Sequence, residues 1–133
     1  MYEFTKELQT GNFQMDAQHR QLLRALNELV EACQEQLSPQ VVERAARDLY
    51  DCAARHMEDE EALQEKYGYP GLEEHRKLHE EFRKAADRMK WSLTAKGAPA
   101  EGAQEEAEAA GRWLLRHIRQ EDAPAAAYIS QKL

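Results

Sequence analysis

The 133-residue chain contains little cysteine, no excess of basic charge and no long hydrophobic run. Its two cysteines, Cys33 and Cys52, form no CxxC pair, which excludes zinc or redox motifs built on thiols. We expect both thiols to be buried and reduced. The 18 Lys and Arg residues against 25 Asp and Glu residues give a net charge of −7. This balance argues against a broad basic surface for nucleic acid or for anionic lipid.

The hydrophobic residues are not gathered into a membrane span or a signal peptide. A membrane helix needs about 18 or more consecutive apolar residues, and residues 1–10 mix Glu, Lys and Thr with their apolar residues. We therefore expect a cytoplasmic protein without a membrane partner. A chain of this length with 42% hydrophobic residues can bury a sizeable core, which predicts one globular domain over residues 1–133.

Apolar residues recur at steps of three and four along most of the chain, which is the periodicity of helices with one buried face. The expected helices are residues 16–37, 39–67, 72–95 and 99–121. Asp16 is the expected N-cap of the first helix, Ser38-Pro39 begins the second, and residues 97–99 separate the third from the fourth. Period-two alternation of useful length is absent, so we expect an all-α fold.

Short connections between four helices of similar length predict an antiparallel up-down-up-down four-helix bundle. Residues 1–15 are left over as an irregular N-terminal arm, which Gly11-Asn12 bends. Four hydrophobic side chains should hold this arm against the bundle: Tyr2, Phe4, Leu8 and Phe13.

All five histidines fall on the apolar faces of the expected helices: His19, His56, His75, His79 and His117. Glu60 shares the face of His56, because a step of four residues turns only about 40° around a helix. A single histidine at such a place is more often a hydrogen-bonded core residue than a ligand. In an antiparallel bundle, however, all five lie at the same end, within about two helical turns of one level.

Buried carboxylates and imidazoles need partners, since an unpaired buried charge costs several kcal/mol. The apolar faces carry no lysine or arginine that could pair with them. A metal ion is therefore the simplest partner for the cluster. The same geometry separates Cys33 from Cys52 by roughly 15 Å along the bundle, which is too far for a disulfide.

Four short motifs contain these residues: MDAQHRQLL with its single histidine, then HMEDE, HRKLH and HIRQED, with the spacings HxxxE, HxxxH and HxxxxD. In this order, and over nearly the whole chain, they resemble the hemerythrin family and, within it, the bacterial single-domain bacteriohemerythrins. The resemblance implies a non-haem di-iron centre (Fe²⁺/Fe³⁺) with an oxo or hydroxo bridge. One iron would be held by His75, His79 and His117 and the other by His19 and His56, with Glu60 and Asp122 bridging both.

The number of bonds in this ligand set indicates what it can do. Five imidazoles, two bridging carboxylates and the oxygen bridge leave one position open on two octahedral irons, at the iron with only two histidines. The resemblance implies that O₂ binds there reversibly as a hydroperoxide, for oxygen storage, delivery or scavenging. It also implies an apolar pocket around O₂, lined by Leu22, Met57, Trp113 and Ile118.

Two other functions stay open. A di-iron peroxidase or an O₂ or NO reductase would need an electron donor, such as a redox partner protein, and the sequence shows no flavin or nicotinamide motif. An oxygen- or iron-sensing module would need an output domain in addition to the bundle. Reversible O₂ binding without turnover is the favoured hypothesis, in a monomer or a weak homo-oligomer.

Two local predictions concern the ends of the motifs. The five residues from His117 to Asp122 turn about 140° around an ideal helix, so the backbone must depart from a regular helix for both to reach one centre. Pro124 removes an amide donor and favours a wide turn or a helix end near Asp122. Glu61, about 100° from Glu60 around the helix, is expected to face solvent.

Overall fold

The computed structural model describes residues 2–94 and 100–133, and the side chains of residues 2–88 and 104–133. Its helices are α1 (Phe13–Gln34), α2 (Pro39–Lys66), α3 (Leu72–Thr94), α4 (Ala100–His117) and α5 (Ala123–Ser130). A short 3-10 helix, η1 (Lys6–Leu8), precedes α1, and a π-helical turn, η2 (Ile118–Asp122), joins α4 to α5. No strand occurs within the described ranges.

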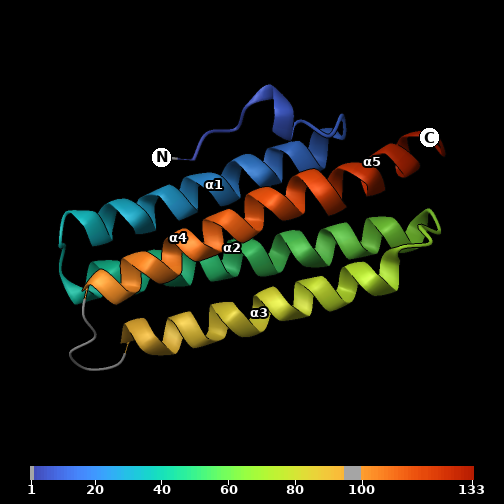
Figure 1. The fold of residues 1–133 in the computed structure, drawn as a ribbon. Coiled ribbons are helices and arrows are strands. Elements are labelled where there is room, and N and C mark those ends of the chain that lie inside the picture. The colour runs from blue at the N-terminus through green and yellow to red at the C-terminus, as the bar shows by residue number, and fades with distance from the viewer. Residues whose placement is uncertain (1, 95–99) are drawn as a thin grey trace.

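The four long helices form an antiparallel bundle, as predicted (Figure 1). Helix α1 packs against α2 and α4, and α3 packs against α2 and α4, so each helix has two neighbours around a common core. The fourth helix does not end at residue 121 as expected, because α4, η2 and α5 follow one another as a single rod (Figure 1). The predicted break at residues 97–99 lies outside the described residues.

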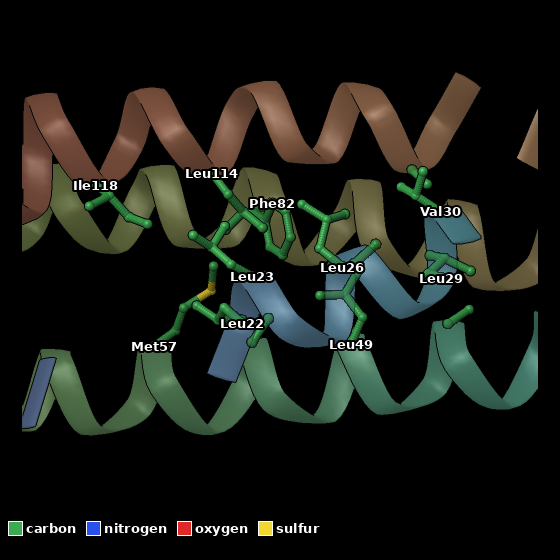
Figure 2. Close-up of a cluster of buried hydrophobic side chains, with 14 of the residues drawn as sticks. Leu22, Leu23, Leu26, Leu29, Val30, Leu49, Met57, Phe82, Leu114 and Ile118 are labelled. Atoms are coloured by element: carbon green, nitrogen blue, oxygen red, sulfur yellow. The ribbon is translucent and has the colours of Figure 1, made fainter. Parts of the chain in front are cut away.

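The core is built from the apolar faces that the periodicity identified. Leu22, Leu26 and Leu29 of α1 are almost completely buried. They project into the space between the helices together with Leu49 of α2 and Leu114 of α4 (Figure 2). This apolar layer fixes the rotation of each helix, and therefore also fixes which polar side chains point inward nearer the other end of the bundle.

The two cysteines are free, in agreement with the prediction that no disulfide forms. Cys33 is buried in the core, as expected. The expectation that Cys52 is buried as well is wrong, because its side chain is only half-buried at the edge of the α1–α2 interface and lines a polar surface pocket with Arg55. Burial raises the pKa of both thiols, which keeps them in the unreactive protonated form.

The N-terminal arm lies along the outside of α1 (Figure 1). Leu8 is buried, and Tyr2 and Phe4 pack against the core as half-buried side chains, in agreement with their predicted role. Phe13 is 87% exposed, so its predicted contact with the bundle is wrong. The arm is also held by a hydrogen bond from the Tyr2 backbone N–H to Asn27 Oδ1, at 2.9 Å.

Helix α1 begins earlier than predicted. Its N-cap is Asn12, whose side-chain oxygen accepts a hydrogen bond from the Met15 backbone N–H at 3.0 Å. Asp16 lies inside the helix instead of capping it, and its Oδ1 accepts hydrogen bonds from the backbone N–H and the hydroxyl of Thr10. Both residue types are good caps, and the bend of the arm at Thr10 decides between them.

Helix α2 begins as predicted, with Ser38 as N-cap and Pro39 in the first turn. It ends before Gly68, whose φ of +66° reverses the chain toward α3. Among the described residues, no helix combines the length and the apolar character that crossing a membrane requires.

Candidate metal centre

Seven buried polar side chains meet at one end of the bundle. None of these seven residues is more than 5% exposed to solvent. They come from every long helix: His19 from α1, His56 and Glu60 from α2, His75 and His79 from α3, His117 from α4, and Asp122 from η2. These are the residues that the sequence motifs identified. The prediction that antiparallel helices bring all five histidines to one level is therefore confirmed by the geometry.

The Nε2 atoms of the five imidazoles point toward one another. The Nε2 atoms of His19 and His56 are 3.2 Å apart. On the other side of the cluster, His117 Nε2 lies 3.1 Å from His75 Nε2 and 3.2 Å from His79 Nε2. Two facing nitrogens form a hydrogen bond only if one of them carries a proton, so each of these contacts needs a proton or a cation between the rings.

The two carboxylates lie between the imidazoles. Glu60 Oε1 is 2.7 Å from His75 Nε2 and 3.0 Å from His79 Nε2. Asp122 Oδ1 is 2.9 Å from the Nε2 atoms of both His75 and His117, while its Oδ2 is 2.9 Å from His19 Nε2. Asp122 thus faces both sides of the cluster, one oxygen toward each.

The potential ligand atoms divide into two groups, each of which could hold a metal ion. One group consists of Glu60, His75, His79, His117 and Asp122, and the other of His19, His56, Glu60 and Asp122. Within each group the nitrogen and oxygen atoms all lie within 4.8 Å of one another. Because Glu60 and Asp122 belong to both groups, two ions bound here would share these two carboxylates.

The pKa shifts within the cluster indicate that protons alone do not satisfy all of its buried groups. Burial, with the charge of Asp122, raises the pKa of Glu60 to about 7. Burial would lower the pKa of His75, but hydrogen bonds to Asp122 and Glu60 raise it to about 10. Burial and the charges of His75 and His117 lower the pKa of His79 to about 2.

Asp122 behaves in the opposite way to Glu60. Burial alone would raise its pKa, but hydrogen bonds from His117 and His19 hold the pKa well below its usual value. In addition, the neighbouring imidazoles of His75 and His79, whose centroids are 4.5 Å apart, favour opposite charge states. A metal cation coordinated by neutral imidazoles removes this conflict and neutralises the carboxylates, so the donor set fits a metal.

Several imidazoles are held from behind through Nδ1, which leaves Nε2 directed at the centre. His56 Nδ1 lies 2.8 Å from Gln18 Oε1, and His79 Nδ1 lies 2.8 Å from Glu61 Oε2. His75 Nδ1 lies 3.2 Å from the buried Gln64 amide, whose oxygen can accept the Nδ1 proton when the amide is turned over.

These supporting residues were not predicted from the sequence, and the prediction that Glu61 faces solvent is wrong. The Glu61 side chain is only 16% exposed, because it turns toward α3 and not toward solvent. Gln64 had a signal in the sequence: it continues the four-residue steps from His56 through Glu60. Gln18 and Glu61 had none, because each is one residue from a ligand and therefore lies about 100° away from the ligand face of its helix.

The backbone between His117 and Asp122 is the wide turn that the HxxxxD spacing predicts. Over η2 the backbone bonds run from residue i+5 to residue i, as in the hydrogen bond from the Ala123 N–H to the Ile118 carbonyl. The wider turn brings Asp122 Oδ1 to 2.9 Å from His117 Nε2. The alternative of a helix end at this point is wrong, because Pro124 occupies the first turn of α5, where no amide donor is needed.

Of the predicted pocket residues, Leu22, Met57 and Ile118 are each only 1% exposed. They lie together in the core layer (Figure 2). Trp113 is half-buried, and its indole stacks on His117 with the ring centroids 4.6 Å apart. Phe82, which was not among the predicted pocket residues, also packs against this indole, with the ring centroids 4.9 Å apart.

Comparisons with known proteins agree with this geometry. The family model "Hemerythrin HHE cation binding domain" matches residues 10–128, a span that includes all seven buried polar residues. Bacteriohemerythrin from Pseudomonas aeruginosa (strain LESB58) is 30% identical over 118 residues, 88% of this chain and 74% of the relative. Bacteriohemerythrin from Stenotrophomonas maltophilia is 30% identical over 117 residues, 87% and 73% of the two chains. Myohemerythrin from Theromyzon tessulatum is 26% identical over 123 residues, 91% and 88%.

Proposed function

The chain belongs to the hemerythrin family, and from this premise we propose that it is a non-haem di-iron protein that reversibly binds O₂ at one open iron position. The single observation that carries the proposal is the position of Glu60 and Asp122, which both lie within reach of two separate groups of imidazoles. A site for one metal ion would need only one of these groups.

The two groups differ in their number of imidazoles, and this difference defines the two iron positions. The ligands would be His75, His79 and His117 at one position, His19 and His56 at the other, and Glu60, Asp122 and an oxo or hydroxo ion between them. With one imidazole fewer, the second position would keep one coordination site free for a small neutral ligand. Irons held by these residues would supply the electrons for reversible O₂ binding.

The residues of the chain provide three further conditions for reversible binding. Gln18 and Glu61 receive the Nδ1 protons of His56 and His79, and thereby keep the Nε2 lone pairs directed at the iron positions. The fully buried Leu22, Met57 and Ile118 exclude water and anions, which would promote irreversible oxidation. The half-buried Trp113 stacks on the His117 imidazole and limits its movement.

The experiment is metal analysis followed by O₂ addition and removal. Protein purified without oxygen should contain two irons per chain and little zinc, because four-coordinate zinc would leave ligands unused. Adding O₂ to the reduced protein should change its absorbance, and removing O₂ should reverse the change. One iron per chain would contradict the di-iron site. Continuous consumption of O₂ or peroxide would instead favour the peroxidase or reductase.

The apolar pocket is tested with two leucines of α1. We expect Leu22→Gln to keep the iron and to speed conversion to the unreactive diferric form, because a polar side chain admits water beside the open position. Leu29→Gln is the matched control, since Leu29 is equally buried but lies ten residues from His19 along α1, roughly 15 Å. Equal oxidation rates for both variants would contradict the pocket.

The cytoplasmic location and the monomeric or weakly oligomeric state stay predictions.

A further inference from the structure

The two groups of imidazoles have supporting residues of different charge. In the three-histidine group, His79 Nδ1 donates a hydrogen bond to the carboxylate of Glu61 at 2.8 Å. In the two-histidine group, His56 Nδ1 donates to the neutral amide of Gln18, also at 2.8 Å. Among the described residues, Glu61 is the one carboxylate that accepts a hydrogen bond from the rear nitrogen of a clustered histidine.

Two arginines of α3 pair with the carboxylate of Glu61. Arg83 Nη2 lies 2.9 Å from Glu61 Oε2, the same oxygen that faces His79, and Arg76 Nε lies 3.5 Å from Oε1. The carboxylate has little access to solvent, so these contacts fix its position. Charged hydrogen bonds of this kind are stronger than neutral ones and fix the orientation of the imidazole that donates to them.

The amide of Gln18 is also held by a neighbouring side chain, but it places no charge beside the histidine. Its Nε2 donates to Asp59 Oδ2 at 2.7 Å, which directs its Oε1 toward His56. The negative charge of Asp59 is therefore one residue further from the cluster than the charge of Glu61. The hydrogen bonds behind His56 and His79 have the same length and differ in the charge of the acceptor.

We propose that Glu61 is a positioning residue that acts through His79 to stabilise the ferric state of the iron at the three-histidine position. When a ferrous ion gives one electron to O₂, or to a mediator in a titration, the positive charge beside the His79 imidazole would increase by one. A carboxylate on the far side of that imidazole raises its basicity and favours the higher charge. Gln18 gives the open position no such stabilisation. This inference rests on the di-iron function proposed above.

The decisive variant is Glu61→Gln, which keeps a hydrogen-bond acceptor for His79 Nδ1 and removes the charge. We expect it to retain two irons per chain and to shift the reduction equilibrium toward the ferrous state about tenfold, which corresponds to about 59 mV for one electron. Glu61→Ala removes the acceptor as well, and should lower iron affinity by roughly 10–100-fold. The readouts are iron content and the midpoint potential from a mediated spectroscopic titration without O₂.

Glu65→Gln is the matched control. Glu65 lies one turn further along α2, its side chain is 71% exposed, and it faces Arg76 at 3.5 Å, so the variant removes the same charge near the same arginine. Its potential should equal that of the unchanged protein. A double variant, Gln18→Glu with Asp59→Asn, moves the carboxylate next to His56 without setting two carboxylates against each other. It should shift the midpoint potential in the opposite direction, toward the ferric state.

The outcomes separate this inference from the proposed function. If Glu61→Gln and Glu65→Gln have the same potential as the unchanged protein while two irons are bound, Glu61 has no positioning role. If Glu61→Gln loses iron as Glu61→Ala does, the charge is needed for folding or affinity and the inference is wrong. If reversible O₂ binding fails, iron content and midpoint potential still test the role of Glu61, since neither measurement uses O₂.

Discussion

Two glutamates of α2, Glu58 and Glu60, differ in function because of their positions on the helix. Glu60 is 2% exposed and lies between His75 and His79, whereas Glu58 is exposed on the opposite side of the helix. We expect Glu60→Ala to lower iron affinity by more than about 100-fold, because the Glu60 carboxylate would bridge both irons. Loss of a residue that only supports a ligand already lowers metal affinity by up to about 100-fold. Iron content after dialysis against a chelator measures the effect.

Glu58→Ala is the control, and it should keep two irons per chain. Equal iron retention in the two variants would contradict a bridging role for Glu60. Glu61, the immediate neighbour, is not a suitable control, because its carboxylate contacts His79 and its removal should also weaken iron binding. Circular dichroism of both variants distinguishes loss of iron from loss of the helices.

At this scale, the sequence predicts the residues whose position on one helix is sufficient to direct them inward. His56 and Glu60 share a face because they are four residues apart, and the structure brings both into the cluster. Gln18 and Glu61 could not be predicted in the same way. Each supports a histidine on another helix, and the distance between two helices depends on the packing of the whole core.

At the scale of the element, η2 is the feature that the ligand spacing required. The turn is one residue wider than an α-helical turn, and it places Asp122 on the same side of the rod as His117. The sequence showed that the helix must be irregular here, since the spacing of five residues is visible. It did not show that the helix resumes as α5, because Pro124 is compatible both with a helix end and with the first turn of a new helix.

We expect the length of this turn to determine metal binding. Deleting the exposed Gln120 restores a four-residue spacing, and residues four apart on a regular helix also converge, so this variant should keep most of its iron. Inserting one alanine after Gln120 gives a spacing of six residues, which moves the carboxylate away from His117 and should abolish binding at both positions. Iron content decides the matter. Equal losses in the two variants would contradict the geometric role of η2.

The start of α1 shows why the sequence could not locate every element end. Asn12 and Asp16 are both residues that commonly cap helices, and they lie only four residues apart. The choice depends on Thr10, which bonds to Asp16 once the arm folds back along α1. With Asp16 occupied, Asn12 caps the helix, and Phe13 at its first position points into solvent.

At the scale of the whole molecule, the bundle consists of an apolar layer and a polar layer along one axis. The leucines of α1 and their neighbours form the first, and the seven converging side chains form the second. The apolar layer stabilises the fold with or without metal. The polar layer consists of imidazoles and carboxylates from four helices, so its contribution to stability depends on the cation or proton that binds there.

Protons can only partly replace a metal in this layer. His75 has a pKa of about 10 in the folded metal-free protein, above the ordinary value of 6.5. Its stabilisation is complete below pH 6.5 and is lost as the pH rises through 10. Glu60, raised from 4.5 to about 7, contributes in the same direction, and its stabilisation is lost as the pH rises through 7.

We therefore expect the melting temperature of the metal-free protein to fall between pH 6.5 and pH 9, and that of the iron-loaded protein to fall much less. When iron occupies the site, His75 Nε2 binds the metal and no proton, so rising pH removes nothing there. Thermal unfolding followed by circular dichroism in both forms measures the two slopes. His75→Gln without metal should fall less steeply than the unchanged metal-free chain, because the proton that is lost belongs to His75. Parallel slopes for the metal-free and iron-loaded proteins would mean that the seven side chains do not exchange protons for metal.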